Sequence, residues 1–254
     1  VVEEYFQLRP KVVAVDTETT GLDWFIDDLF LVQVGWGWNS NYAFPIEYLR
    51  MAASIIEDEQ SEKVFHNAKF DMHFLERAGV QTRGKIHDTQ VMARLLLPQS
   101  ASLKLKDLST ILIDNTANDA EQALKKWMTQ EKRERKKQFT KILKDLGYMR
   151  KEYDQWKKDG TPLPTEVEKA EASFQFEPTY ADVPKEIMEP YATGDVKYTL
   201  ALMNLFMPKI ERNQLLPSYQ RDMRTLLHVY NWEKTGWAVD VRRLEEGYKH
   251  GSER

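Results

Sequence analysis

The sequence predicts an α/β fold, a mixed sheet flanked by helices, that carries a mostly helical insertion. Three observations lead to this prediction. Short apolar runs near the start are typical of strands, helical patterns alternate with a further strand between residues 47 and 97, and residues 115–185 change to a charged helical pattern. At 254 residues the chain is long enough for one large domain with an appendage.

Three strands are expected first. Val12–Val15 is an apolar run that ends at Asp16, and Phe30–Trp36 is rich in valine, leucine and aromatic residues. Asn41–Ile46 follows the turn-like residues Gly35–Ser40. Because the spacers are short, the three strands are expected to pair as an antiparallel meander.

Helices and a fourth strand follow. In order they are a helix at Glu47–Glu57, a strand at Lys63–His66, and helices at Ala68–Ala78 and Asp88–Leu97. Gly79 is a suitable C-cap for the second helix, and Pro98 stops the third. Asp88 stands near a helix start and is therefore expected to cap it.

The insertion is predicted to be helical and to protrude. Asn118 with Glu121, and Thr165 with Glu168, have the spacing of N-terminal capping pairs. Between them, Thr129–Gln138 contains no apolar residue, so a helix there is expected to be exposed.

Charge is distributed unevenly along the chain. Residues 121–160 contain 13 Lys and Arg against 7 Asp and Glu, a net of +6, whereas the chain as a whole has a net charge of -4. Such a basic element can steer a nucleic acid towards an acidic site, or it can be a solvated face that serves as a spacer or docking surface. Both interpretations stay open at this stage.

The last part of the chain returns to regular helical patterns. Lys185–Phe206 is a long helix with Pro190 near its first turns, and Gln220–Lys234 is another. Thr235–Asp240 separates it from a last helix that begins at Val241.

Composition excludes several classes of protein. The chain has no cysteine, which excludes disulfides, thiolate metal sites and cysteine nucleophiles. It has only five histidines, which argues against a histidine-rich zinc site. Membrane-span and signal-peptide patterns do not occur, and no GxGxxG follows the first strand. The first residue is Val1, which suggests an excised fragment of a longer protein.

Asp16 and Glu18 form the first chemical motif. They end the first strand, where alternation sends both side chains to the same face. Two adjacent carboxylates repel each other unless a cation lies between them, and oxygen ligands suit Mg²⁺ or Mn²⁺. The alternative is a solvated strand end.

Two further pairs lie at helical spacing. Asn67 and Asp71 are four residues apart at a helix start, and Tyr191 and Asp195 are four apart in the long later helix. Taken alone, the first pair is a capping asparagine with an exposed aspartate, and the second is a half-buried tyrosine beside a carboxylate. Their joint order with Asp16 and Glu18 is more specific.

Taken together, these motifs resemble those of the DEDD group of 3′–5′ exonucleases, in the subgroup whose third motif carries tyrosine. Gln220–Leu244, with Gly236 and the pair Val239-Asp240, is similar to the segment that joins the proofreading domain of family A DNA polymerases to the polymerase domain. The resemblance covers about residues 10–112 and 184–246. It implies an exonuclease domain at residues 1–215 and the start of the connection to a polymerase domain at 216–254.

The resemblance implies a ribonuclease H-like sheet and hydrolysis of DNA from its 3′ end, with release of nucleoside monophosphates. It also implies two divalent ions, Mg²⁺ or Mn²⁺, held by Asp16, Glu18, Asp71 and Asp195, with Asp16 shared between the ions. Tyr191 is expected to orient the attacking water.

Substrate contacts implied by the resemblance are Leu22, as a wedge against the terminal base, and Asn67. Core packing is the alternative for Leu22 and is the expected fate of Trp24 and Phe25. The expected partners are single-stranded DNA or a frayed primer 3′ end, and a polymerase domain of the same longer chain. The protein is expected to be a monomer in the cytoplasm of a bacterial or phage-infected cell.

Two rival functions remain. One is a stand-alone exonuclease of the same group that acts on RNA, as RNase D does. The other is a non-catalytic module that docks on nucleic acid. Retention of all four carboxylates and the tyrosine argues against the second.

Overall fold

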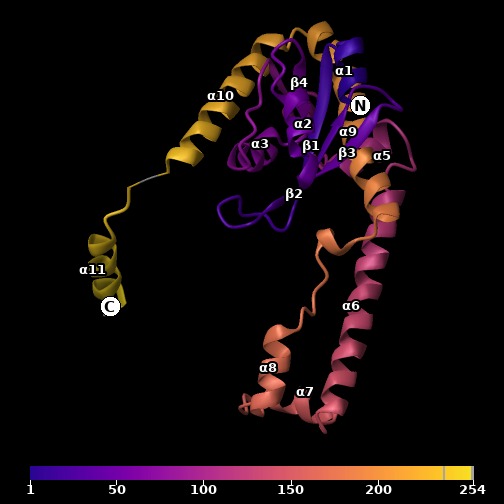
Figure 1. The fold of residues 1–254 in the computed structure, drawn as a ribbon. Coiled ribbons are helices and arrows are strands. Elements are labelled where there is room, and N and C mark those ends of the chain that lie inside the picture. Colours follow the sequence, from indigo (N-terminus) through magenta and orange to yellow (C-terminus); the bar gives the residue numbers. More distant parts are fainter. Residues whose placement is uncertain (237, 253–254) are drawn as a thin grey trace.

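A computed structural model of the chain describes residues 1–236 and 238–252. Its centre is a mixed five-stranded sheet in the order β3-β2-β1-β4-β5 (Figure 1). The strands are β1 (Val12–Thr19), β2 (Leu29–Gly35), β3 (Asn41–Pro45), β4 (Glu62–Phe65) and β5 (Ile86–Asp88). The predicted α/β class with a mixed sheet and flanking helices is confirmed.

The helices surround this sheet and extend from it. They are α1 (Val2–Leu8), η1 (Ile46–Tyr48), α2 (Leu49–Ile56), α3 (Ala68–Arg77), α4 (Thr89–Leu96), α5 (Leu105–Leu112), α6 (Asp119–Asp145), α7 (Arg150–Asp159), α8 (Thr165–Ser173), η2 (Tyr180–Asp182), α9 (Lys185–Arg212), α10 (Leu216–Thr235) and α11 (Val241–Ser252). None of the described helices has the length and apolar character needed to cross a bilayer.

Strand pairing follows the predicted meander on one side only. β1 pairs antiparallel with β2, which pairs antiparallel with β3, so the meander is confirmed. On its other edge β1 pairs parallel with β4, and β4 pairs parallel with β5. β1 continues four residues beyond the predicted Val12–Val15, because Asp16 and Glu18 alternate with the buried Thr17 and keep the pairing with β2.

The long helix α9 lies against the sheet at Gly35. A Cβ atom on Gly35 would lie 3.1 Å from Cγ2 of Val196 and closer still to the Asn41 side chain. Glycine therefore allows α9 to approach β2, and this approach brings the residue before Val196 to the sheet. Buried apolar residues of α9 pack with α4 and α5 in one cluster, while α2 and α3 contribute to a separate cluster.

The insertion forms a protruding arm made of α6, α7 and α8, which extends away from the sheet (Figure 1). At its far end Phe139, Leu143, Tyr153 and Val167 are buried in a small hydrophobic cluster of their own. Near the sheet, Leu124 of α6 packs in a different cluster with residues of α9.

Several local predictions were wrong or only partly right. Asn118 occupies the N-cap position of α6 as predicted, but its side chain makes no capping hydrogen bond, and Thr165 lies inside α8, with Pro164 at the N-cap. Thr129–Gln138 is helical and mostly exposed, as predicted, although Arg135 is half-buried and pairs with Asp182. The short elements α1, α5 and β5 were not predicted.

The helix α10 packs on the body of the molecule although it lies beyond residue 215. Its Tyr219 and Tyr230 are buried, and the Tyr230 hydroxyl donates to the Glu76 carboxylate of α3. In α11, by contrast, Val241, Leu244 and Tyr248 are exposed.

Candidate active site

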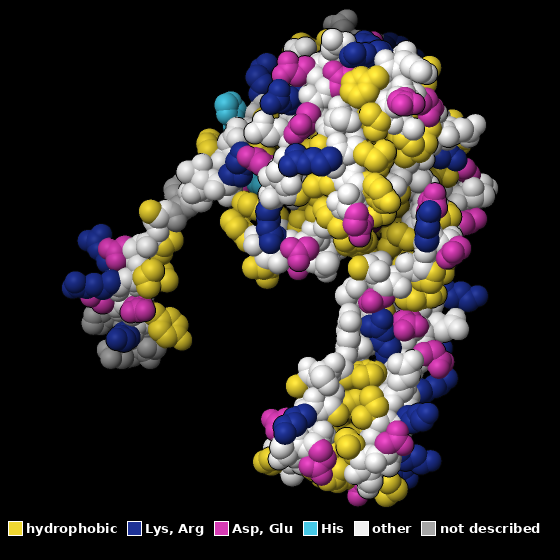
Figure 2. Space-filling model, in the orientation of Figure 1, with side chains coloured by type: hydrophobic (Ala, Val, Ile, Leu, Met, Phe, Trp, Pro, Cys, Tyr) yellow, Lys and Arg dark blue, Asp and Glu magenta, His cyan; other side chains and the backbone are white. Residues whose placement is uncertain are grey.

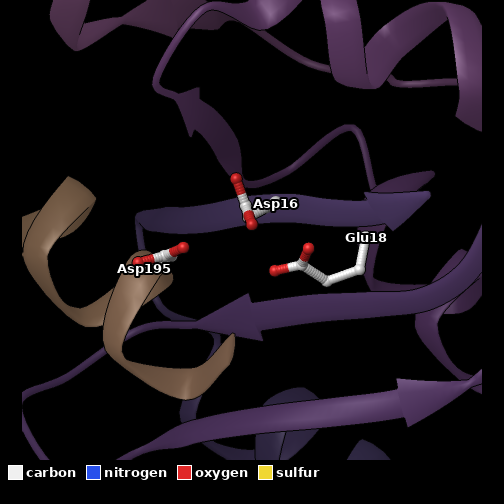
Figure 3. Close-up of side chains that lie close together, drawn as sticks. All are labelled: Asp16, Glu18 and Asp195. Carbon is white, nitrogen blue, oxygen red and sulfur yellow. The ribbon is translucent and has the colours of Figure 1, made fainter. Parts of the chain in front are cut away.

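Three carboxylates converge on one face of the sheet. Asp16 and Glu18 come from β1 and Asp195 comes from α9, and each offers a ligand oxygen within 4.8 Å of the others. Figure 3 shows the three carboxylates directed towards one another from the strand and the helix. Residues about 180 positions apart in sequence therefore form one acidic site.

Local structure explains this convergence. Residues 16 and 18 of β1 project to the same face because strand side chains alternate. The register opposes Asp16 to Gln33 and Glu18 to Leu31, and the Gln33 amide donates to a Glu18 oxygen at 3.4 Å. Asp195 reaches the same face because α9 approaches the sheet at Gly35.

Burial and like charge make this acidic site electrostatically unfavourable. Burial raises the pKa of Asp16 to about 7, against the attraction of the Lys106 ammonium. Burial also raises the pKa of Glu18 well above its usual range, and the Asp16 charge adds to that increase. Such a group of carboxylates is stabilised by a cation, and hard divalent ions prefer oxygen ligands.

Asp71, the fourth predicted carboxylate, lies beside this group of three and is not a member of it. It projects from α3, is 2% exposed, and accepts a hydrogen bond from the Thr17 hydroxyl at 2.7 Å. Burial and then the Asp16 charge raise its pKa well above the usual range. Asp71 is therefore electrostatically linked to Asp16, while its hydrogen bond is with the residue between Asp16 and Glu18.

Tyr191 lies one turn before Asp195 on α9. Its pKa is raised above the usual range, first by burial and then by the Glu18 charge, so the phenol remains protonated at neutral pH. The Lys106 ammonium lies 4.7 Å from the centre of its ring. Tyr191 is thus a hydrogen-bond donor beside the acidic group.

Lys106 is a site residue that the sequence analysis missed. It is the second residue of α5, and its ammonium contacts the Asp195 carboxylate. In the sequence it is one of 36 Lys and Arg residues and stands in a segment for which no helix was predicted. Only the packing of α5 against α9 brings it to the carboxylates.

Asn67 has a left-handed backbone conformation, with φ 76° and ψ 56°, at the start of α3. Its side chain makes no capping hydrogen bond, so the capping alternative was wrong. Asp88 takes that role instead: its carboxylate accepts from the backbone N–H groups of Asn67 and Ala68. This arrangement leaves the exposed Asn67 side chain free of a capping role, four residues before Asp71.

Asp88 also caps α4, as predicted. The same carboxylate accepts from the backbone N–H groups of Gln90 and Val91. One buried side chain therefore satisfies the first turns of two helices, of which α3 carries Asp71.

Leu22 is 84% exposed, so the alternative that it belongs to the core was wrong. Phe25 is also exposed, contrary to prediction. Trp24 is half-buried as expected, and its ring stacks on His73 at 4.3 Å. The loop after β1 therefore presents apolar side chains at the surface.

Comparison with known proteins identifies related sequences. A family model described as 3′–5′ exonuclease, of the family A DNA polymerase type, matches residues 2–142. The DNA polymerase of Escherichia phage T5 is 28% identical over 202 residues, which cover 76% of this chain and 19% of the polymerase. The chain therefore spans about a fifth of the length of that relative.

Solved structures share the fold at lower identity. NrnC of Brucella melitensis superposes with a TM-score of 0.61 and 18% identity over 92% of this chain and 90% of that chain. NrnC has also been solved with bound Mg²⁺ and bound to pGG. RNase D of Escherichia coli, an exoribonuclease involved in structured RNA processing, gives a TM-score of 0.53 and 15% identity over 91% of this chain and 48% of that chain.

Proposed function

The chain belongs to the 3′–5′ exonuclease family whose model matches residues 2–142, and on this premise we propose that it hydrolyses DNA from the 3′ end to nucleoside monophosphates. The observation that carries this proposal is the convergence of Asp16, Glu18 and Asp195 within 4.8 Å. Phosphodiester hydrolysis requires neutralisation of phosphate charge and activation of water, and an acidic site performs both when it holds divalent ions.

The residues present fit divalent metal. Three buried or half-buried carboxylates offer oxygen ligands within 4.8 Å of one another, and burial raises the pKa values of Asp16 and Glu18, which a divalent cation would lower. We propose that Asp16, Glu18 and Asp195 hold Mg²⁺ or Mn²⁺ and that Asp71 contributes to a second ion. Bound ions of this kind lower the pKa of a water ligand and stabilise the departing 3′ oxygen.

The remaining site residues act on water and substrate in this proposal. Tyr191 donates its phenolic proton in a hydrogen bond and so orients the attacking water. Leu22, exposed in the loop after β1, packs against the terminal base, and an aliphatic contact tolerates any base. Asn67 supplies an amide to the 3′ end from the start of α3.

We also propose a polymerase context. Residues 1–215 form the exonuclease domain, and residues 216–254 begin the connection to a polymerase domain, with α10 as its docked first helix. The T5 relative is a DNA polymerase, which supports this assignment. The substrate is then single-stranded DNA or a frayed primer end, and the protein works as a monomer inside a bacterial or phage-infected cell.

A second candidate, an exonuclease that acts on RNA, is favoured by one observation. RNase D, an exoribonuclease, matches 91% of this chain in fold. At 15% identity this match shows a shared fold alone, so the choice between DNA and RNA needs its own experiment.

The experiment compares 5′-labelled single-stranded DNA and RNA of one sequence, and a DNA duplex with a frayed 3′ end. With Mg²⁺ or Mn²⁺ we expect stepwise shortening of DNA from the 3′ end, loss of activity in EDTA, and much slower cleavage of RNA. Faster cleavage of RNA would support the second candidate. Absence of cleavage together with absence of metal binding in calorimetry would leave a non-catalytic docking module.

A further inference from the structure

Lys106 places a positive charge inside the acidic site. Its side chain is 13% exposed, and its ammonium contacts the carboxylate of Asp195, which is 8% exposed. Burial lowers the pKa of Lys106, and the attraction of Asp16, Glu121 and Glu18 on the same ammonium opposes that decrease in part. The ammonium is therefore held in a largely buried position by its contact with Asp195 and by the charges of three further acidic residues.

An oxygen of Asp195 cannot serve an ammonium and a divalent ion at the same position. The two cations also repel each other strongly at contact distance in a partly buried site. Entry of a divalent ion at Asp195 therefore requires that the Lys106 ammonium move. A lysine suits such a movement, because its charge is carried at the end of a flexible four-carbon chain.

A polar cavity beside the site offers space for the displaced ammonium, although Lys197 also lines it, with its own ammonium 3.8 Å from the centre of the Trp38 ring. Its volume is about 340 Å³, and Lys106 itself forms part of its wall, between α9 and the turn from β2 to β3. Side-chain oxygens that can accept from an ammonium are offered by its lining residues Asn39, Asn41, Thr116 and Thr193. The Asn41 side-chain oxygen is buried and accepts no hydrogen bond from the residues that the structure describes.

We propose that Lys106 is a built-in counter-ion of the carboxylate site, which competes with divalent metal for Asp195 and withdraws into this cavity when metal binds. The inference rests on the proposed metal-dependent function and adds to it a residue that sets the metal affinity. Lys106 stabilises the protein when divalent metal is scarce, and it raises the metal concentration at which the site fills.

The test replaces Lys106 by methionine, which keeps much of the apolar stem and removes the charge. We expect calorimetric titration with Mn²⁺ to show binding at least about tenfold tighter than in the original protein, because repulsion between the two cations is removed. The melting temperature in EDTA is expected to fall, and saturating Mn²⁺ is expected to close that difference.

Two controls keep the test decisive. Lys104→Met removes an exposed lysine two residues away and is expected to leave both measurements unchanged. Lys106→Arg keeps the charge and is expected to retain weak Mn²⁺ binding, so it serves also if the methionine variant folds poorly.

Unchanged or weaker Mn²⁺ binding in Lys106→Met would overturn the proposal; if KM for the nucleic acid rose at the same time, Lys106 would instead be a phosphate contact. The proposed function fails by a different result, namely that the original protein binds Mn²⁺ but hydrolyses no nucleic acid.

Discussion

Asp16 lies at a position where burial makes its negative charge unfavourable. Burial raises the pKa of Asp16, Lys106 compensates only in part, and the Asp16 charge in turn raises the pKa values of Glu18 and Asp71. A side chain that served only to stabilise the fold would be poorly placed here. Perturbed carboxylates in such groups are typical of functional sites.

Asp16→Ala is therefore expected to abolish hydrolysis and to leave the fold intact. Removal of this carboxylate relieves repulsion on Glu18 and Asp71, so the free energy of unfolding in EDTA should be at least that of the original protein. Single-turnover cleavage of labelled DNA and urea denaturation provide the two measurements. A variant that cleaves at a near-normal rate with Mg²⁺ or Mn²⁺ would contradict the assignment of Asp16.

Asp88, unlike Asp16, contributes to the stability of the fold, because its carboxylate caps two helices. Asp88→Ala leaves backbone N–H groups at the starts of α3 and α4 without their acceptor. With about 1 kcal/mol for each of two caps, the free energy of unfolding should fall by about 2 kcal/mol or more.

Urea denaturation measures this decrease, and Asp145→Ala, which removes an exposed aspartate at the end of α6, is the matched control. A decrease in Asp88→Ala no larger than in the control would show that the double cap contributes little.

The sequence predicted the elements whose patterns are long and local. The meander and the long helix α9 have apolar residues at regular spacing. The strand β5 has only three residues, which are too few to show a period. Strand alternation placed Asp16 and Glu18 on one face, whereas their convergence with Asp195 was expected from the resemblance to the exonuclease family.

The position of Lys106 in the site and the double role of Asp88 could not be predicted from the sequence. Both depend on interactions between residues that packing brings together, over 89 positions for Lys106 with Asp195 and 20 for Asp88 with Ala68. No local pattern in the chain marks such interactions.

The Lys and Arg side chains of the arm helix α6 lie on two different faces of the helix. Lys132 and Arg135 face inward and pair with Glu177 and Asp182. The basic stripe, defined as Lys126, Arg133, Lys136, Lys141 and Lys144, is exposed and makes no ion pair within the described residues. Figure 2 shows dark blue side chains along the side of α6 that faces away from α8. The stripe extends about 27 Å at 1.5 Å per residue.

Because α6 starts beside the acidic site, the stripe is expected to hold the strand that leads to it. Replacing Lys126, Arg133, Lys136 and Lys144 by glutamine should weaken binding of a long single-stranded DNA. The slope of log affinity against log salt should become shallower by about 0.7 for each phosphate that the variant no longer neutralises. Cleavage of a dinucleotide, which is too short to reach the stripe, should not change.

The matched control replaces four other exposed lysines of the insertion region, Lys151, Lys158, Lys169 and Lys185, by glutamine. Equal weakening in both variants would mean that net charge, rather than the stripe, attracts the nucleic acid. Unchanged affinity across a salt series would leave the arm as a spacer or docking surface.

At the scale of the whole molecule, the far end of the arm does not share a core with the sheet, whereas its base does, through Leu124 and Leu31. Phe139, Leu143, Tyr153 and Val167 are buried together at the end of the arm, in a cluster separate from those at the sheet. Opening of the distal cluster therefore exposes none of the apolar surface that the sheet buries.

Separate cores imply separate opening reactions. The end of the arm can unfold and refold while the sheet remains native, as a small cooperative unit with its own free energy of opening. Native-state amide hydrogen exchange should therefore give two protection levels: the backbone amides around Phe139 and Tyr153 exchange through the smaller opening, and those of β1 and β2 only through global unfolding. Phe139→Ala should speed the first exchange and leave the second unaltered, whereas equal acceleration of both would mean that arm and sheet unfold as one unit.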